Sequence, residues 1–271
     1  MKKVVLFALA LALIFGGSSF AKEKGKKLIT VGYAQVGAES DWRTANTESF
    51  KSTFTEANGY KLIFDDAQQK QENQIKAIRN FIQQDVDYIV VAPVVETGWE
   101  TVLKEAKDAG IPVILSDRMM KLSDNSLYTA WVGGNFLKEG QDAIAWLNGY
   151  VKKNNLVGKT LNIVILQGTI GSSAQVGRTQ GVTEGIAKNP KYKLLAKQTG
   201  EFTQAKGQEV MESFLKAYPK IDVVIAENDN MAFGAIDAIK AVGKKPGKDI
   251  VIISFDAVKE AFNRMIAGDI N

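Results

Sequence analysis

The feature that most constrains the fold is an alternation between short apolar runs and amphipathic stretches, which continues through this 271-residue chain. Most of the runs are rich in Val, Ile and Leu and lack polar alternation, as is typical of parallel strands buried on both faces. They lie at 28–34, 61–64, 88–92, 112–115, 128–132, 161–166, 193–197, 223–226 and 250–254. Helical patterns fill the intervals, for example at 69–84, where Ile78 and Phe81 share one face. Strict βα alternation predicts an α/β fold with parallel sheets.

The strands divide into two arrays, which predicts two lobes. The candidate seam lies at 121–135, where the turn-rich SDNS is followed by a strand and by Gly133-Gly134-Asn135. We therefore predict an N-terminal lobe at 28–127, a first crossing between the lobes at 128–135 and a C-terminal lobe at 136–268.

Residues 1–21 have the pattern of a cleavable secretory signal. Lys2 and Lys3 precede an apolar run at 4–15 that is short for a membrane span, and Ser19-Phe20-Ala21 is a small-x-small cleavage site. We expect export to the periplasm, with residues 22–27 as a basic linker and no membrane insertion after cleavage. An uncleaved membrane anchor is the alternative.

The composition excludes several classes of function. The sequence contains no histidine and no cysteine, which rules out Ser-His-Asp and Cys-His catalysis and zinc sites built on imidazole within it. The net charge is +4, of which two units lie in the leader, and this is no nucleic-acid footprint. We expect no cofactor, no metal and no nucleic-acid partner.

Asp117 and Arg118 stand where the apolar run IPVIL ends. The carboxyl ends of parallel strands border the crevice in which open α/β sheets bind ligands. A carboxylate accepts and a guanidinium donates hydrogen bonds, so this pair suits the adjacent hydroxyls of a polyol. An ordinary surface ion pair is the alternative.

The loop after the first run offers a second group of candidates in ESDWR. Trp42 has an indole that can stack on a sugar ring, and Arg43 can donate to ring or hydroxyl oxygens. Glu39 and Ser40 are weaker candidates from the same loop. The alternatives are a half-buried packing tryptophan and a solvated helix arginine.

Two further candidates follow strands in the second array. Asn228 comes after VVIAE and opens the next helix, where its amide can bind hydroxyls or simply cap the helix. Asp256 follows IVIISF. A binding site between two lobes would draw on both arrays.

Several stretches resemble one protein family. They are VGYAQVGAESDWR at 31–43, FDDAQQKQENQIKAIRNFI at 64–82, VAPVVETGWETVLKEA at 91–106, ILSDR at 114–118, LQGTIGSSAQVGRTQG at 166–181, EFTQAKGQEVMESF at 201–214, ENDNMAFGAIDAIKAVG at 227–243 and KPGKDIVIISFD at 245–256. On these stretches the chain resembles the periplasmic sugar-binding components of ABC importers, the ribose/galactose-binding group. Within that group the likeness is strongest to the galactofuranose-binding branch.

The resemblance implies two Rossmann-like lobes of the type I periplasmic binding protein fold, which close on one sugar. It matches Asp117 and Arg118 to the family's strand-end pair, Arg178 to an arginine that reaches the ligand from the second lobe, and Asp256 to a strand-end carboxylate. A helix-face charge is the alternative for Arg178. Because the family's chain crosses between lobes three times, we expect residues 269–271 to begin a second crossing. We expect a C-terminally truncated copy that lacks its last N-lobe segment.

The predicted function is capture of a monosaccharide, galactofuranose or a related aldose, by a monomeric protein that is not an enzyme and delivers it to an ABC permease. One alternative is a sugar-sensing protein that docks a chemoreceptor or sensor kinase. The other is an exported carbohydrate hydrolase, which needs two catalytic carboxylates across one bond. Asp117 and Asp256 are the pair that such a hydrolase would use.

Overall fold

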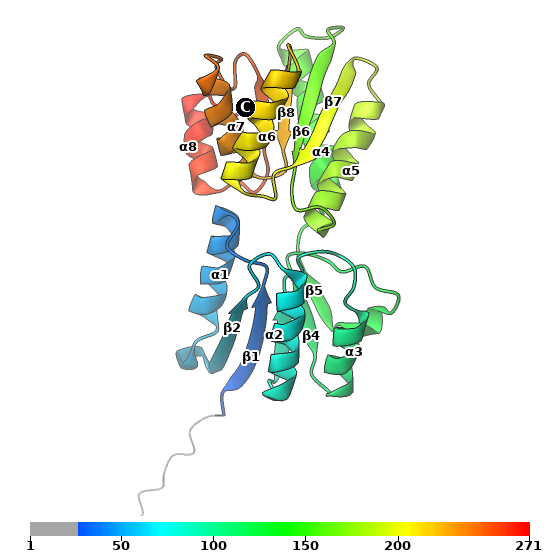
Figure 1. Cartoon of the computed structure of the whole chain (residues 1–271), viewed down its shortest axis with the longest axis vertical. Helices are drawn as coiled ribbons and strands as arrows, with labels where there is room; N and C mark the ends of the chain where they lie inside the picture. Colours follow the sequence, from blue (N-terminus) through cyan, green and yellow to red (C-terminus); the bar gives the residue numbers. More distant parts are fainter. Residues whose placement is uncertain (1–26) are drawn as a thin grey trace, which may run out of the picture.

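The computed structural model describes residues 27–271, and the predicted signal at 1–21 and most of the basic linker lie outside them. Figure 1 shows two lobes stacked along the long axis of the molecule. Each lobe is a parallel sheet covered by helices, with strand order β2-β1-β3-β4-β5 in the first and β7-β6-β8-β9 in the second. The predicted α/β fold with parallel sheets in two lobes is confirmed.

The N-terminal lobe carries one helix on one face of its sheet and two on the other. Its elements are β1 (Ile29–Gln35), α1 (Asp41–Thr53), η1 (Glu56–Asn58), β2 (Tyr60–Asp66), α2 (Gln71–Gln83), β3 (Tyr88–Val91), α3 (Glu100–Asp108), β4 (Val113–Ser116), η2 (Asn125–Leu127) and β5 (Ala130–Val132). Successive residues of β3 alternate between the faces: Ile89 and Val91 pack under α2 and α3, whereas Val90 lies on the face where α1 packs. Both faces are buried, which explains the unbroken apolar runs in the sequence.

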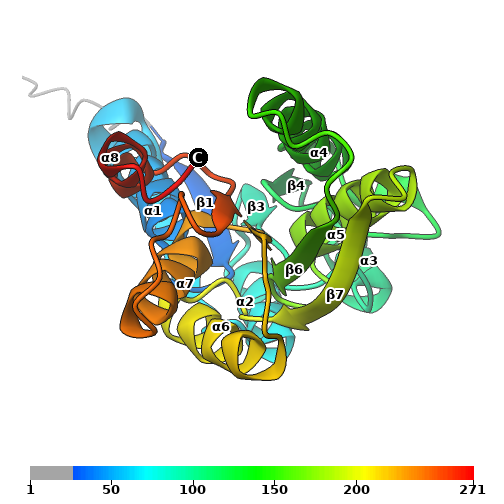
Figure 2. The ribbon, with the colours of Figure 1, turned by 90° about the horizontal axis from the view of Figure 1, so that it is seen from above.

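The C-terminal lobe has two helices packed on each face of its sheet and a fifth helix near the end of the chain. Its elements are α4 (Phe136–Lys153), β6 (Leu161–Gln167), α5 (Ser173–Ala187), β7 (Tyr192–Thr199), α6 (Gln204–Ala217), β8 (Val223–Ala226), α7 (Asp229–Ala241), β9 (Val251–Ile253) and α8 (Lys259–Ala267). Ile163 and Ile165 of β6 face α4 and α5, while Val164 and Leu166 face α6 and α7. The view from above in Figure 2 shows the helix pairs on opposite sides of the sheet.

The segment predicted as the first crossing, 128–135, is divided between two roles. Ala130–Val132 forms β5, which pairs in parallel with β4 and so belongs to the N-terminal sheet. The chain then passes to the second lobe through residues 133–135, ahead of α4. Residues 269–271 lie along β9, because the Asn271 amide donates to the Ile252 carbonyl at 3.1 Å and Ile270 is buried in the C-lobe core.

The two lobes touch at the carboxyl ends of their strands. The Glu96 amide donates to the Gly171 carbonyl at 2.8 Å, and the Met119 amide donates to Ser173 Oγ at 2.9 Å. On the α1 side, the Asp41 amide donates to Asn230 Oδ1 at 3.1 Å. The cleft between the sheets is therefore closed at several points along its rim.

Within residues 27–271, which the structure describes, no helix has the length and apolar character needed to cross a membrane. The same range contains no group of three or more acidic side chains placed to hold a metal ion.

Helices α4 and α5 approach closely through glycine. A β-carbon added at Gly181 would lie 2.5 Å from Leu137 O and 2.7 Å from Gln141 N, both backbone atoms of α4. We expect Gly181→Ala to lower the free energy of unfolding by about 1–3 kcal/mol, since overpacking forces the helices apart. Gly149, on the exposed side of α4, has nothing within 4 Å of that position, so Gly149→Ala is the control and should raise stability by about 0.5–1 kcal/mol. Urea unfolding compares them; equal stability of both variants would contradict the close contact.

Candidate functional site

A cavity of about 360 Å³ lies between the lobes at the carboxyl ends of the strands. All nine residues predicted as candidates line it: Glu39, Ser40, Trp42, Arg43, Asp117, Arg118, Arg178, Asn228 and Asp256. The sequence prediction thus selected side chains that fold into one place, from five separate strand ends and helix starts. Their role in binding a ligand stays a prediction.

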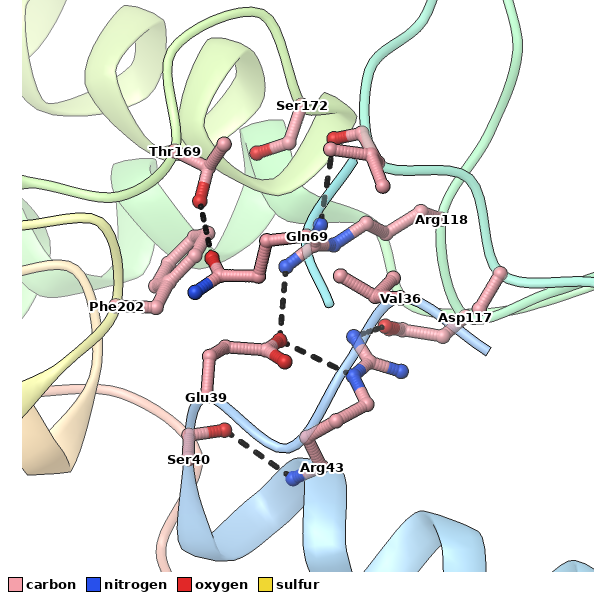
Figure 3. A network of polar contacts seen from close by, with 12 residues as sticks. Val36, Glu39, Ser40, Arg43, Gln69, Asp117, Arg118, Thr169, Ser172 and Phe202 are labelled. Carbon is pink, nitrogen blue, oxygen red and sulfur yellow. Dashed lines mark hydrogen bonds and ion pairs between the residues drawn. The ribbon is translucent and has the colours of Figure 1, made fainter. Parts of the chain in front are cut away.

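Glu39 is the centre of the N-lobe half of the site. Arg43 Nε donates to Glu39 Oε1 at 3.2 Å, and Arg118 Nη2 reaches the same oxygen at 3.4 Å. Arg43 also donates to Asp117 Oδ2 at 2.6 Å. Figure 3 shows Glu39 between the two arginines, with Asp117 on the far side of Arg43. This half of the site is therefore one connected network of two cations and two anions.

Local structure holds this network in place. Ser40 caps α1 by accepting from the Arg43 amide at 3.2 Å, so the loop and the helix start are fixed together. Asp117 has the left-handed φ of 62°, an uncommon conformation for a side-chain-bearing residue that turns its carboxylate toward α1. The predicted alternative of a surface ion pair between Asp117 and Arg118 is wrong, because Arg118 is only 3% exposed and pairs with Glu39.

Arg178 organises the C-lobe half of the site. It is 6% exposed, and it donates to Glu139 Oε2 at 2.8 Å, to Asp256 Oδ1 at 2.9 Å and to the carbonyl of Glu227. The alternative of a charge on an outer helix face is therefore wrong. Because Asp256 pairs with Arg178 and Asp117 pairs with Arg43, both carboxylates face their own arginines in this structure.

Aromatic rings flank every arginine of the site. The Arg178 guanidinium carbon lies 5.3 Å from the ring centroid of Phe136 and 4.9 Å from that of Phe255. Arg43 lies over Trp42 at 4.9 Å, which places the half-buried indole in the cavity wall beside a charge. Such contacts stabilise a cation that has lost its water.

Arg118 also lies over an aromatic ring, and this contact joins the lobes. Its guanidinium carbon is 5.1 Å from the ring centroid of Phe202, which belongs to the C-terminal lobe. The ion pairs of Arg118 and Arg43, in contrast, are all made within the N-terminal lobe. The ring of Phe202 is therefore the element that places one lobe's arginine against the other lobe.

Asn228 caps a helix, which was the alternative to a ligand contact in its prediction. Its Oδ1 accepts from the Met231 amide at 2.9 Å and caps α7, while its Nδ2 donates to the Phe202 carbonyl at 2.9 Å. The residue also borders the cavity. Its amide is thus held by the backbone on two sides, and a ligand contact would use the remaining N–H.

The sequence reasoning missed Phe136, Glu139, Phe202 and Phe255, which also line the cavity. Phe255 directly precedes Asp256 after β9, so the rule that pointed to strand ends would have included it. Phe202 follows the end of β7 in the same way. Phe136 and Glu139 lie in the first turn of α4, and only the three-dimensional packing of α4 against α5 brings them to Arg178.

Burial and ion pairing act in opposite directions on the charged groups. Burial lowers the pKa of Arg118 to about 10, and the repulsion of Arg43 adds to this. Burial also works against the charge of Arg43, but Asp117 and Glu39 beside it raise its pKa above the ordinary value. The pKa of Asp256 is raised by burial, although Arg178 opposes this. Arg118 is consequently the least well compensated cation of the network.

The charges of the site nearly cancel. Arg43, Arg118 and Arg178 each face at least one of the carboxylates Glu39, Asp117, Glu139 and Asp256. Two buried atoms of the described residues nevertheless have no hydrogen-bond partner, Glu39 Oε2 and Arg118 Nε. An acceptor and a donor that are buried without a hydrogen-bond partner cost free energy. The arrangement suits an uncharged ligand rich in hydroxyls rather than an anion.

Comparison with known proteins agrees with this geometry. Residues 31–271 match the family described as "Periplasmic binding protein domain". The galactofuranose-binding protein of Escherichia coli (strain K12) is 50% identical over 246 residues, which cover 90% of this chain and 76% of that protein. The ribose import binding protein of Bacillus subtilis (strain 168) is 33% identical over 203 residues, covering 75% of this chain and 62% of that one.

A solved structure is similar over a comparable range. The periplasmic binding protein component of the arabinose ABC transporter from Shewanella sp. ANA-3, bound to α- and β-L-arabinofuranose, superposes with a TM-score of 0.84 at 50% identity. The match covers 89% of this chain and 78% of that one. The present chain therefore belongs to the periplasmic binding protein family.

The two N-lobe arginines should respond differently to replacement. We expect Arg43→Met to lower the free energy of unfolding of the ligand-free protein by about 3–5 kcal/mol, because it leaves two buried carboxylates without their main partner. Arg118→Met removes a cation whose burial is poorly compensated, and its expected cost is below about 1 kcal/mol. Urea unfolding without sugar measures both. Equal losses in the two variants would contradict the assigned pairing.

Proposed function

We propose that this protein captures a neutral monosaccharide in the periplasm, galactofuranose or a related aldose, and delivers it to the permease of an ABC importer. It would act as a monomer and perform no chemistry on the sugar. The observation that carries the proposal is an interlobe cavity in which three arginines are already paired with carboxylates, so that its wall presents charged hydrogen-bonding groups without a surplus of cations. The sugar-binding relatives described above support it.

The chemistry of the cavity supports recognition without catalysis. Charge-assisted hydrogen bonds from arginine and to carboxylate are stronger than neutral ones and are directional, so they suit the several hydroxyls of a sugar. A stereoisomer that leaves one of these buried groups unmatched is rejected, at about 1–3 kcal/mol for each group. The aromatic rings of Trp42, Phe136 and Phe255 offer apolar faces for the C–H groups of the sugar ring.

The direct test is calorimetric titration with arabinose, galactose, ribose and a methyl galactofuranoside, with galactose 1-phosphate as the charged comparison. We expect saturable binding of at least one neutral sugar and much weaker binding of the phosphate, since the cavity holds no unpaired cation. Failure of every neutral sugar to bind would overturn the proposal. Preference for the phosphate would show that the charge balance has been misjudged.

Arg118→Ala should abolish measurable sugar binding while leaving the fold intact. Removing one partner from a desolvated, charge-assisted network costs about 2–5 kcal/mol of binding free energy, which is a hundredfold or more in affinity at the middle of that range. Arg79→Ala is the matched control, because Arg79 pairs with Glu105 on the exposed faces of α2 and α3. Sugar affinity of the Arg118 variant within threefold of the unmodified protein would place the site elsewhere.

Trp42→Ala should weaken sugar binding by about 0.5–1.5 kcal/mol beyond the loss of buried area, and Trp42→Phe should be milder because it keeps an aromatic face. The intrinsic fluorescence of the protein should change when sugar is added, and the Ala variant should lose most of that change. Trp146, on the exposed side of α4, supplies the control substitution Trp146→Ala. Unchanged affinity and an unchanged fluorescence response in the Trp42 variants would remove this indole from the site.

A further inference from the structure

Glu227 is a fully buried carboxylate that lies behind the wall of the cavity rather than in it. The residue follows β8 and is 0% exposed, and it is absent from the residues that line the cavity. Its Oε2 accepts from the Gly168 amide at 2.8 Å, and its Oε1 accepts from the hydroxyl of Thr179. One side chain thus ties together the end of β6, helix α5 and the end of β8.

One of these contacts supports Arg178. Thr179 is the next residue on α5, and Arg178 itself donates to the main-chain carbonyl of Glu227. Glu227 therefore holds this stretch of α5 through both its side chain and its backbone. The orientation of the Arg178 guanidinium between Glu139 and Asp256 depends on where this part of α5 sits.

The other contact supports Phe202. Gly168 lies flat against the ring of Phe202, so closely that a β-carbon added there would be 1.9 Å from the ring. The same ring carries the guanidinium of Arg118 from the opposite lobe. Since Glu227 fixes the Gly168 amide, it fixes the surface on which the ring of Phe202 rests. Both lobes' arginines are therefore linked to this one carboxylate.

The hydrogen-bond pattern favours the ionised form of Glu227. Thr179 Oγ1 already accepts from Gln167 Nε2 and from Gln175 Nε2, each at 2.9 Å, so its own hydrogen is directed at Glu227. The Gly168 amide also donates to Glu227, and both carboxyl oxygens must accept. A proton on Oε1 would point at the Thr179 hydroxyl, whose lone pairs are taken. A proton on Oε1 therefore breaks the link to α5, and a proton on Oε2 weakens it by removing the negative charge.

We propose that Glu227 is a positioning residue for the sugar site: its ionised form holds Arg178 and Phe202 in the binding arrangement, and its protonation loosens both and lowers sugar affinity. The inference rests on the proposed function, since it concerns the affinity of that same site. Glu227 touches no sugar in this arrangement and acts only through the groups that line the cavity.

The titration of Glu227 falls close to neutral pH. Burial raises its pKa from 4.5 to about 7, against the hydrogen bonds from Thr179 and Gly168 and the attraction of Arg178 on α5 and Lys197 on β7. On α7 the nearest acid, Asp229, is engaged with Ser254 and the Val258 amide. Its pKa is also raised by burial, to about 6, and the pKa of the cavity residue Asp256 is raised. A variant that changes only Glu227 is needed to separate these groups.

The signs of the two pH effects are opposite. The folded-state pKa lies above the unfolded value, so uptake of the proton by Glu227 stabilises the fold as pH falls from about 7 toward 4.5. Sugar binding favours the ionised form of Glu227, so the affinity for sugar falls as the pH drops through the pKa of this group. By reciprocity, sugar binding lowers the pKa of Glu227 and releases protons. A purely structural carboxylate would change stability with pH and leave affinity unchanged.

The experiment titrates the protein with the neutral sugar that binds it best, from about pH 6 to about pH 8, in buffers of different ionisation enthalpy. We expect affinity to fall by about tenfold toward the acid end, as the loss of a charge-assisted hydrogen bond implies, with proton release on binding near neutral pH. Glu227→Gln mimics the protonated acid, with one acceptor and an N–H₂ facing Thr179. It should bind like the unmodified protein at low pH and show little change across the range.

Asp222→Asn is the matched control. Asp222 also accepts from a backbone amide of β6, that of Asn162 at 2.8 Å, but it does so at the end of β8 remote from the cavity. This variant should keep both the affinity and the pH profile of the unmodified protein. Thr179→Val should reproduce the loss seen with Glu227→Gln, and Thr179→Ser should restore binding, which covers the case in which the Gln variant does not fold.

The outcomes separate the two proposals. A protein that binds sugar with the same pH profile before and after Glu227→Gln overturns this inference and leaves the proposed function standing. If the unmodified protein binds sugar with the same affinity from about pH 6 to about pH 8, this inference is also overturned and the proposed function still stands. A protein that binds no neutral sugar at any pH overturns the proposed function, and this inference falls with it.

Discussion

The burial of three guanidinium groups between the lobes is the constraint on which the rest of the site depends. Removing an arginine from water is so costly that each one needs carboxylates close by and an aromatic face against its plane. Arg43 forms an ion pair with Asp117, and Arg178 forms ion pairs with Glu139 and Asp256, which lie on separate elements. These pairs lie within single lobes, so each lobe carries a preassembled half of the cavity. Within the arginine network the link between the halves is the contact of Arg118 with the ring of Phe202, which is not an ion pair.

The same charge balance selects the kind of ligand. A cavity with surplus cations would attract phosphates and carboxylates, and one with unpaired acids would draw cations. Here the ion pairs hold hydrogen-bond donors and acceptors in fixed directions and leave little net electrostatic field. Such an arrangement discriminates among uncharged ligands by the positions of their hydroxyl groups. Arg118, whose pKa burial lowers to about 10, has an unmatched Nε, and Glu39 has an unmatched Oε2. The incompletely satisfied part of the network thus lies beside Arg118, the arginine that contacts the other lobe.

Local sequence patterns predicted most of the fold because its strands are buried on both faces, and burial on both faces demands apolar runs. They also placed Asp117, Asn228 and Asp256 correctly at strand ends that face one crevice. Phe136 and Glu139 were missed because their place in the cavity arises from the close contact of α4 with α5, which glycines such as Gly181 permit. The run at 128–132 was predicted as a strand but assigned to the crossing between the lobes, because only the pairing of Ala130–Val132 with β4 places that strand in the N-terminal sheet.

The backbone around the cavity is under constraint at three of the residues that line it. Asp117, Phe202 and Asp256 all have positive φ values, of 62°, 63° and 93°. Left-handed conformations of residues other than glycine cost of order 1–3 kcal/mol and persist only where surrounding contacts enforce them. Arg43 holds Asp117, Arg178 holds Asp256, and Phe202 is held between Gly168 and the amide of Asn228. The left-handed backbone at each residue directs its side chain into the cavity. The ion pair or ring contact of that side chain stabilises the backbone conformation. Geometry and electrostatics therefore support each other, and the buried carboxylate of Glu227 connects the two C-lobe turns to one another.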